Sequence, residues 1–546
     1  MRKNIFFCLL LIAVDASSQF AFKNIDSIDV NNINAAMGVH GNVWLKPDSS
    51  APSCEFPKGS GKHIAFAGGL WIGAYQQNLL KVAAQSLSLD QIDYWPGPII
   101  NAAMQPSITY AQSQNWARVW KVSRGEINMF LSQSVHTVAN TPTSILEWPG
   151  QGNGYAKGNG GAILFSPMSD YSRPFAPFVD VNNNGVYEPL AGDYPKIIGD
   201  QAIWTIFNDK GPDKKRLTQT EPLGVEVRCL AYAYSRNTLV DNVIFYEYEI
   251  TNRLWYSYDS VSIGFFADLD LGDPYDEYVG YDSGRNLAIT YNADVNDSSG
   301  DLNSYGTHIP LAGVQLLDMP GGGCGNFRPA SSFMAFNGAG AGFPSQFLDP
   351  TTGVEFYNYM NARLRDGQPL SNGGKYIATG DPSDPAGNSE CANKNLKGDR
   401  RMILSSKMDS AFKPGQTIKF VIALVASDPA PGNACPGLTF APIQEVADTA
   451  LNVYCNPLAP LLTSIGSSNN LRYNVYPNPA NDRLYVNFDK ANQYTVVISD
   501  MTGKKLLSGS GYREQFVLNT ALLPKGVYLL QVQSPTEKQI TRFVKN

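Results

Sequence analysis

Residues 245–251 read FYEYEIT, and this alternation of apolar and polar side chains decides the fold class. Successive side chains of a strand point to opposite faces of a sheet, so the pattern predicts a strand with one buried and one solvated face. Similar runs recur along the chain, at 64–75, 116–122, 203–207, 225–234, 243–250, 261–266, 287–291 and 418–426. Helical periodicity is rare and is clearest at 443–454. The sequence therefore predicts a mostly β protein.

Long loops rich in Gly, Asn and Pro separate these runs, at 150–161, 294–306, 319–345 and 371–399. Strands joined by such loops predict a large β-sandwich-type body with loop insertions, or two sandwiches that share a face. We expect this body to span residues 19–455, with a possible boundary between two sub-domains near 215–240.

The composition excludes some classes of function. The 546 residues include 42 Lys and Arg against 48 Asp and Glu, a net charge of −6. A weakly acidic chain lacks the basic field that nucleic acids require, so we expect no nucleic-acid partner. Apolar residues make up 43% of the chain, which is enough to bury a core and excludes general disorder.

The first residues have the pattern of a secretory signal peptide. Arg2 and Lys3 precede an apolar run at 5–14, and Ala16 and Ser18 fit the small-residue positions of a cleavage site. We therefore predict a signal peptide at 1–18. A membrane-spanning helix needs roughly 20 apolar residues, and no other segment approaches that length, so we expect an exported chain without a membrane span.

Six cysteines remain after the predicted signal peptide, and an even count in an exported chain predicts disulfides. Cys435 and Cys455 are the predicted pair, because they are close in sequence and flank the helical pattern at 443–454. The alternative is a set of buried free thiols. No CxxC pair occurs, which argues against a zinc site.

Residues 180–188, DVNNNGVYE, form the sharpest chemical motif. Oxygen-bearing side chains stand at the first, third and fifth places and a glycine at the sixth, as at the start of an EF-hand-type calcium loop. The twelfth place holds Ala191 instead of the usual Glu, and Asp193 could replace it. The alternative is a turn without an ion. The predicted calcium ligands are Asp180, Asn182, Asn184, Val186 through its carbonyl, Glu188 and Asp193.

A second acidic stretch, DLDLGDPYDE at 268–277, follows the predicted strand at 261–266. Carboxylates this close repel one another unless a cation or a basic partner neutralises them. Three interpretations stay open: a calcium site, a solvated acidic loop, and a catalytic pair formed by Asp268 and Asp270. For the first, the predicted ligands are Asp268, Asp270, Asp276 and Asp282. The loop at 294–301 is a weaker candidate.

Motifs of known catalytic sites are missing: the sequence has no HExxH, GxSxG or P-loop. A polysaccharide hydrolase needs only two suitably spaced carboxylates, so that class stays open. Six tryptophans in the first half could stack on sugar rings or pack in the core. They are Trp71, Trp95, Trp116, Trp120, Trp148 and Trp204.

The C-terminal part is a separate region. Residues 456–472 are rich in Pro, Ser and Asn and predict a linker. Beyond it, short strand patterns at 484–488, 494–498, 526–532 and 542–544 predict a small Ig-like β-sandwich over 473–546.

This region resembles the type A C-terminal sorting domain of the type IX secretion system of Bacteroidota. The resemblance rests on NVYPNPA at 474–480, SDMTGK at 499–504, LLPKGVY at 522–528 and TRFVK at 541–545. It implies Sec export to the periplasm, then recognition by the translocon and sorting machinery. Cleavage with attachment to surface lipopolysaccharide, or release, would follow. The sorting-signal residues are Tyr476, Pro477, Asn478, Pro479, Asp500, Gly503, Gly526 and Tyr528.

The body resembles large secreted Bacteroidota proteins that carry the same sorting domain, through blocks such as GGLWIG at 68–73, YWPGP at 94–98 and GDYP at 192–195. That resemblance implies little mechanism. The sequence therefore predicts a secreted cell-surface or extracellular protein, stabilised by calcium and acting in adhesion, matrix or glycan binding. The alternative is a secreted polysaccharide hydrolase that uses Asp268 and Asp270.

Overall fold

A computed structural model of the protein describes residues 22–47, 51–87, 91–100, 106–165, 175–212, 215–297, 303–338, 342–370, 373–459, 473–500, 504–534 and 538–546. The predicted signal peptide, most of the predicted linker and Gly503 lie outside the described residues. The chain divides into two compact units, one of residues 1–123 and 143–459 and one of 124–142 and 460–546.

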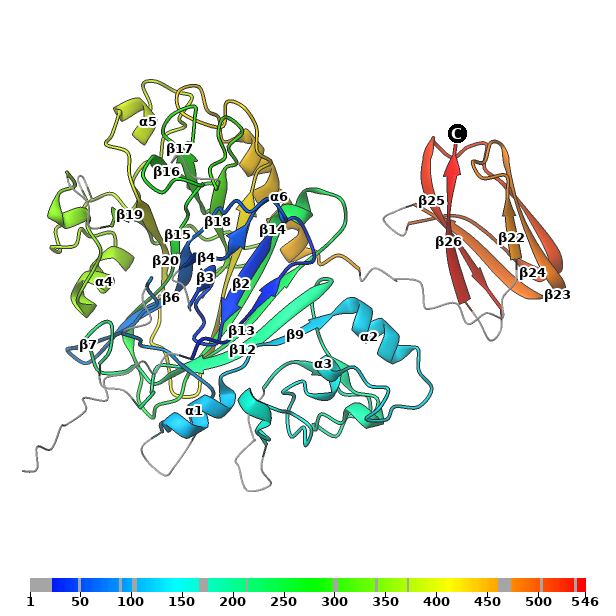
Figure 1. Ribbon diagram of the computed structural model, residues 1–546, viewed down its shortest axis with the longest axis horizontal. Coiled ribbons are helices and arrows are strands. Elements are labelled where there is room, and N and C mark those ends of the chain that lie inside the picture. Colours follow the sequence, from blue (N-terminus) through cyan, green and yellow to red (C-terminus); the bar gives the residue numbers. More distant parts are fainter. Residues whose placement is uncertain are drawn as a thin grey trace, which may run out of the picture. The chain divides into compact units, whose positions relative to one another are not determined.

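A nine-stranded antiparallel sheet forms one layer of the first unit (Figure 1). Its order is β16-β17-β18-β21-β14-β13-β12-β8, and β9 pairs with β12. The stretch at 245–251 lies in β14, inside the sheet, and β13 crosses the segment 215–240. The strands are β8 (Trp95–Pro96), β9 (Trp120–Ser123), β12 (Gln201–Asn208), β13 (Val225–Ala233), β14 (Val243–Asn252), β16 (Glu277–Asp282), β17 (Leu287–Asn292), β18 (Ala312–Asp318) and β21 (Thr417–Ala426).

A five-stranded sheet, of order β19-β20-β15-β6-β7, forms the second layer. One continuous core joins the two layers: Tyr246 and Ile422 of the first sheet pack in the same buried cluster as Leu70, Phe265 and Leu404 of the second. The body is therefore a β-sandwich, and the prediction of a mostly β chain is confirmed. The strands are β6 (Ala67–Gln76), β7 (Leu79–Ala83), β15 (Asp259–Asp268), β19 (Ser332–Asn337) and β20 (Arg400–Lys407).

Smaller elements complete the two units; α2 belongs to the second unit and the others to the first. The outer face of the five-stranded sheet carries a second buried cluster, in which Trp71 packs on Phe356 of α4 with ring centroids 4.6 Å apart. The short strands are β1 (Ile25–Ile28), β2 (Asn34–Gly38), β3 (Leu45–Lys46), β4 (Ala51–Pro52), β5 (Cys54–Glu55), β10 (Phe178–Val179) and β11 (Tyr194–Pro195). The helices are α1 (Tyr110–Trp116), α2 (Arg124–Leu131), α3 (Thr143–Leu146), α4 (Gly353–Met360), α5 (Glu390–Asn393) and α6 (Ala441–Cys455).

Two local predictions have clear outcomes. The helical pattern at 443–454 is α6. The strand predicted at 116–122 begins only at Trp120, because residues 110–116 form α1. The reason is a capping box: the Thr109 hydroxyl accepts from the Gln112 N–H, and the Gln112 side chain accepts from the Thr109 N–H. These reciprocal bonds satisfy the first helical donors.

The C-terminal strands form their own five-stranded sheet, of order β22-β23-β25-β26 with β24 paired to β23. Leu484, Val496, Leu530 and Phe543 are among its buried core residues. The predicted strands at 484–488 and 494–498 are one strand, β23, whose pairing with β24 shifts register between Asn487 and Asn492. The strands are β22 (Tyr473–Tyr476), β23 (Arg483–Ser499), β24 (Lys505–Asn519), β25 (Gly526–Gln533) and β26 (Lys538–Lys545).

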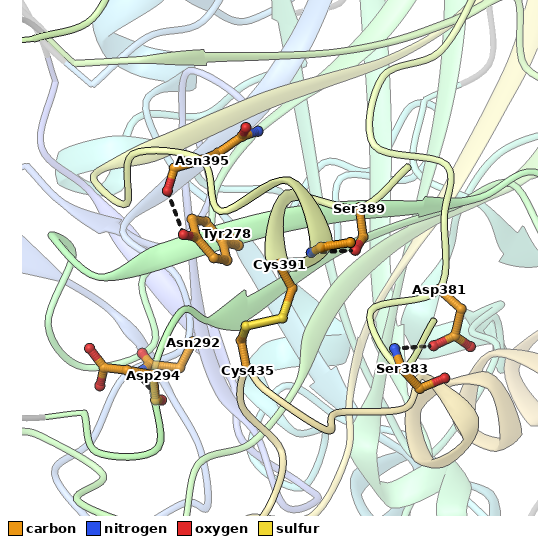
Figure 2. The surroundings of a disulfide bond; sticks show 10 residues. Tyr278, Asn292, Asp294, Asp381, Ser383, Ser389, Cys391, Asn395 and Cys435 are labelled. Carbon is orange, nitrogen blue, oxygen red and sulfur yellow. Dashed lines mark hydrogen bonds between the residues drawn. A yellow bond between two sulfur atoms is a disulfide. The ribbon is translucent and has the colours of Figure 1, made fainter. Parts of the chain in front are cut away.

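Two disulfides close long loops of the body, and the predicted Cys435–Cys455 pair is wrong. Cys455 pairs with Cys324, and Cys435 pairs with Cys391 (Figure 2). Helix α6 begins at Ala441 and ends at Cys455, so its rise of about 22 Å carries Cys455 away from the segment that holds Cys435. A disulfide requires Cα atoms within about 7 Å. The remaining cysteines of the described residues, Cys54 and Cys229, are buried and free.

Candidate metal centre

The acidic cluster of the body consists of Asp268, Asp270, Glu277 and Asp399. Asp268 is the last residue of β15, Asp270 follows in the loop, and Glu277 is the first residue of β16. Asp399 directly precedes β20, which pairs with β15 so that Arg401 faces Asp268. Antiparallel pairing therefore brings the start of β20 to the end of β15, and the carboxylates meet there.

The carboxylates are close, and they are buried apart from Asp399, whose side chain is 24% exposed. One oxygen each of Asp268, Asp270 and Asp399 lies within 4.8 Å of the other two. Asp268 is 2% exposed and Glu277 is fully buried. Glu277 uses one oxygen to accept the Leu271 N–H at 2.7 Å. The other oxygen of Glu277 and one oxygen of each aspartate are buried and accept no hydrogen bond from any described residue.

The electrostatics of the cluster favour an additional cation. Burial raises the pKa of Asp268, Glu277 and Asp399, and it raises that of Asp270 to about 7. The neighbouring carboxylates raise these pKa values further. Arg401 lies 2.8 Å from Asp399 and 3.5 Å from Asp268, and it also contacts Asp349. Arg400 also acts on Asp399, but it forms its ion pair with Glu390, so Arg401 alone contacts several of these carboxylates.

The residues fit a hard divalent cation. Calcium binds six to eight oxygens at about 2.4 Å, so two ligands on opposite sides of the ion lie about 4.8 Å apart. The three aspartate oxygens span that distance or less. The sequence prediction included Asp268 and Asp270 but missed Glu277 and Asp399. Glu277 lies in the same acidic stretch and could have been found, whereas Asp399 carries no sequence signal because strand pairing places it.

The other two residues predicted from this stretch lie elsewhere. Asp276 accepts from the Asn292 amide at 3.2 Å, and its pKa rises to about 7 through burial and then the charges of neighbouring aspartates such as Asp297. Asp282 is at the far end of β16, where it pairs with Arg285 at 2.9 Å. The structure therefore does not bring Asp282 into the acidic cluster.

In the Asp180 loop, residues 180–193, the predicted ligand oxygens accept hydrogen bonds, unlike those of the acidic cluster. Asp180 accepts the N–H groups of Gly185 at 2.7 Å and Asn184 at 3.2 Å. Asp193 is buried and accepts from the Val181 and Glu188 N–H groups, both at 2.8 Å. Asn182 and Asn184 accept backbone N–H groups of Asn184 and Val186 in turn. Gly185 has φ 78°, which suits glycine at the turn. The loop thus satisfies the side-chain oxygens of Asp180, Asn182, Asn184 and Asp193 with its own N–H groups.

The tryptophans considered as sugar platforms are core residues. All six are at most 5% exposed: Trp71, Trp95, Trp116, Trp120, Trp148 and Trp204. Trp255 is 78% exposed, but it lies outside that set. A sugar-binding surface therefore cannot rest on these six indole rings.

The predicted sorting-signal residues lie around the turns of the C-terminal sheet. Tyr476 ends β22, Pro477 and Pro479 follow it, and the Asn478 side chain accepts the Val544 N–H at 2.9 Å. Asp500 accepts the Lys504 N–H at 3.0 Å. Gly526 begins β25, and the Tyr528 hydroxyl donates to the Pro524 carbonyl at 2.7 Å.

Comparison with protein families assigns this region. Residues 474–546 match the secretion system C-terminal sorting domain. The chain is a cargo protein of the type IX secretion system. Its sorting domain interacts with the type IX sorting machinery and directs export to the cell surface or the extracellular space. Among the described residues, no helix is long and apolar enough to cross a membrane.

Comparison with solved structures and with curated proteins does not assign the body of the chain to a family. A solved structure of PorZ, an essential bacterial surface component of the type-IX secretion system of Porphyromonas gingivalis, aligns with 73% of this cargo protein. The identity is 11% and the TM-score 0.13, and the alignment covers 49% of PorZ, about half its length. No curated protein matches the chain.

Proposed function

We propose that the body is a calcium-stabilised extracellular module that acts in adhesion, matrix or glycan binding. The observation that carries the proposal is the acidic cluster, whose buried carboxylate oxygens lack hydrogen-bond donors among the described residues. Unpaired buried charge costs several kcal/mol, and a bound cation would remove that cost. Extracellular calcium is abundant enough for a site of modest affinity.

The burial of the cluster argues against a hydrolase. A glycosidase pair must reach both the sugar and a water molecule, and its two carboxyl pKa values are pushed apart. Asp268 is buried at the end of β15, where a sugar ring cannot reach it. Neither residue lines the cavities next to Trp204, Arg328 or Phe343.

Cation binding would serve a surface protein by holding long loops in place. The cluster connects the β15–β16 loop to the segment before β20. Metal bound only by the folded state adds its binding free energy to the stability of that state. The Asp180 loop is a second proposed calcium site, and it should depend less on the ion because its own N–H groups already bond Asp180 and Asp193.

Thermal melting of the full chain tests the proposal. We expect EDTA to lower the melting temperature at pH 7 and added calcium to restore it. Asp259→Asn is a control for loss of a carboxylate outside the cluster, because Asp259 is exposed at the opposite end of β15. The melting temperature of this variant should respond to EDTA as that of the parent does. A melting temperature indifferent to EDTA would contradict the calcium proposal.

An activity assay tests the hydrolase alternative. We expect no release of reducing sugar from a panel of plant, fungal and bacterial polysaccharides. Hydrolysis that Asp270→Asn abolishes, with the fold intact by circular dichroism, would replace the adhesion proposal with the enzymatic one.

The last step of export is also a proposal. By resemblance to other sorting-domain cargo, Sec export through residues 1–18 precedes removal of the sorting domain, and the body is then attached to surface lipopolysaccharide or released. Immunoblots of outer-membrane and culture-medium fractions would show where the body accumulates. A full-length product that stays in the periplasm would contradict this route.

A further inference from the structure

A cavity of 810 Å³ lies on the outer face of the nine-stranded sheet. Its floor comes from three adjacent strands: Trp204 of β12, Arg228 and Leu230 of β13, and Glu247 and Glu249 of β14. Its walls come from the preceding segment and include Phe175, Pro177, Phe178, Gly185, Lys196 and Ile198. Gly185 belongs to the Asp180 loop, so that loop shapes the rim.

Strand register produces two rows of different chemistry on this floor. Trp204, Leu230 and Glu247 are cross-strand neighbours, and this row is mainly apolar. The next row holds Arg228 and Glu249 and is charged, and Lys419 of β21 continues this row just outside the residues that line the cavity. The alternating residues on the opposite face, such as Tyr246 and Tyr248, are in the core.

The charges on the floor are paired. Arg228 lies 3.0 Å from Glu249, and Lys419 lies 2.7 Å from Glu247. The floor therefore carries little net charge but many hydrogen-bonding groups. The Oε2 atom of Glu247 is buried and accepts no hydrogen bond from any described residue. A ligand that donates a hydroxyl to this oxygen would satisfy it.

We propose that this cavity binds an uncharged oligosaccharide. Sugar rings present apolar C–H faces, which suit Phe178 and Leu230, and hydroxyls, which suit paired carboxylates and a guanidinium. The volume lies within the range of about 300–1,000 Å³ that is usual for small-ligand sites. The proposal deepens the adhesion function and rests on it, but it uses residues apart from the acidic cluster.

Other ligand classes fit the cavity less well. A peptide that adds a strand needs an open sheet edge, whereas β12, β13 and β14 are each hydrogen-bonded on both sides. An anionic polymer would meet Glu247 and Glu249 on the floor, where Arg228 already pairs with Glu249, and Lys196 of the wall adds a single positive charge.

Calorimetric titration of the full chain in calcium tests the proposal. The probes are hexasaccharides of glucose, mannose, xylose and galactose, with polygalacturonate and heparin as charged comparators. We expect at least one neutral hexasaccharide to bind. Glu249→Gln and Phe178→Ala should each weaken it about tenfold or more, because each loses a direct contact with the sugar. Glu249 is half exposed, so its variant should fold normally.

Glu221→Gln and Phe327→Ala are the matched controls, since both residues are exposed and outside the cavity, and they should bind as the parent does. Three results would overturn the proposal: no neutral hexasaccharide binds, only the charged polymers bind, or Glu249→Gln binds like the parent. The EDTA melting test is read separately, so loss of sugar binding with an intact calcium response rejects this site alone.

Discussion

The Asp180 loop and the acidic cluster both gather oxygen ligands, but they hold them in opposite ways. The loop is continuous in sequence, and its own N–H groups bond Asp180 and Asp193. The cluster joins three separate segments, and its buried oxygens lack such donors among the described residues. A site that satisfies itself loses little without an ion, whereas a site that buries unpaired charge loses much. The cluster should therefore be the more cation-dependent of the two.

Asp270→Asn should give the largest effect. The sign of its effect on the free energy of unfolding should depend on whether calcium is present. In calcium, loss of a charged ligand should lower the free energy of unfolding by about 3 kcal/mol, the scale of saturating ligand stabilisation. In EDTA, the same change removes repulsion among buried carboxylates and should raise the free energy of unfolding by about 1 kcal/mol. Urea unfolding of both proteins in both buffers measures the crossover.

The control for this crossover is Asp259→Asn, whose free energy of unfolding should match that of the parent in both buffers. If Asp270→Asn is equally destabilised in calcium and in EDTA, then Asp270 has only a packing role, and the comparison between the two regions fails.

The pH dependence should give the next largest effect. In EDTA the folded pKa of Asp270 is about 7, above its ordinary value of 3.8, so the folded state binds the proton more tightly than the unfolded state. This stability is present at low pH and is lost as the pH rises through 7. Between pH 7 and pH 5 the chelated protein should gain about 2 kcal/mol from this residue alone.

Urea unfolding at several pH values in EDTA measures the gain, and Asp270→Asn should gain about 2 kcal/mol less than the parent, because Asp268 and Glu277 still contribute. In calcium the trend should reverse, because protons compete with the ion for the carboxylates. If the protein in EDTA instead loses stability as the pH is lowered from 7 to 5, then other groups of the protein already neutralise the carboxylates of the cluster.

Asp180→Asn should give the smallest effect. The amide retains an acceptor for the Gly185 N–H but removes a charge, so the free energy of unfolding should change by no more than about 1 kcal/mol. Limited proteolysis should detect the loop itself: in calcium, cleavage within 180–193 should be faster in the variant than in the parent. A loss of stability equal to that of Asp270→Asn would show that the two regions depend on calcium alike.

Local patterns predicted a large part of the fold. The alternation in β14 and the periodicity of α6 depend on neighbouring residues, and both elements form where the pattern places them. The strand predicted at 116–122 was partly wrong because apolar spacing there fits both element types and the capping at Thr109 favours a helix. The disulfide prediction failed because closeness in sequence ignores the length of the helix between Cys435 and Cys455.

The sequence by itself determined the features that short stretches encode: the sorting domain, the strands with one wet face, and the Asp180 loop with its turn at Gly185. Only the tertiary structure decided which distant residues meet. Pairing of β15 with β20 brings Asp399 to Asp268, and sheet packing buries Trp204 while Glu247 and Glu249 line an open cavity. The physical reason is range, since turns and strand alternation depend on adjacent residues, whereas charge clusters, disulfides and cavities depend on how whole sheets pair and pack.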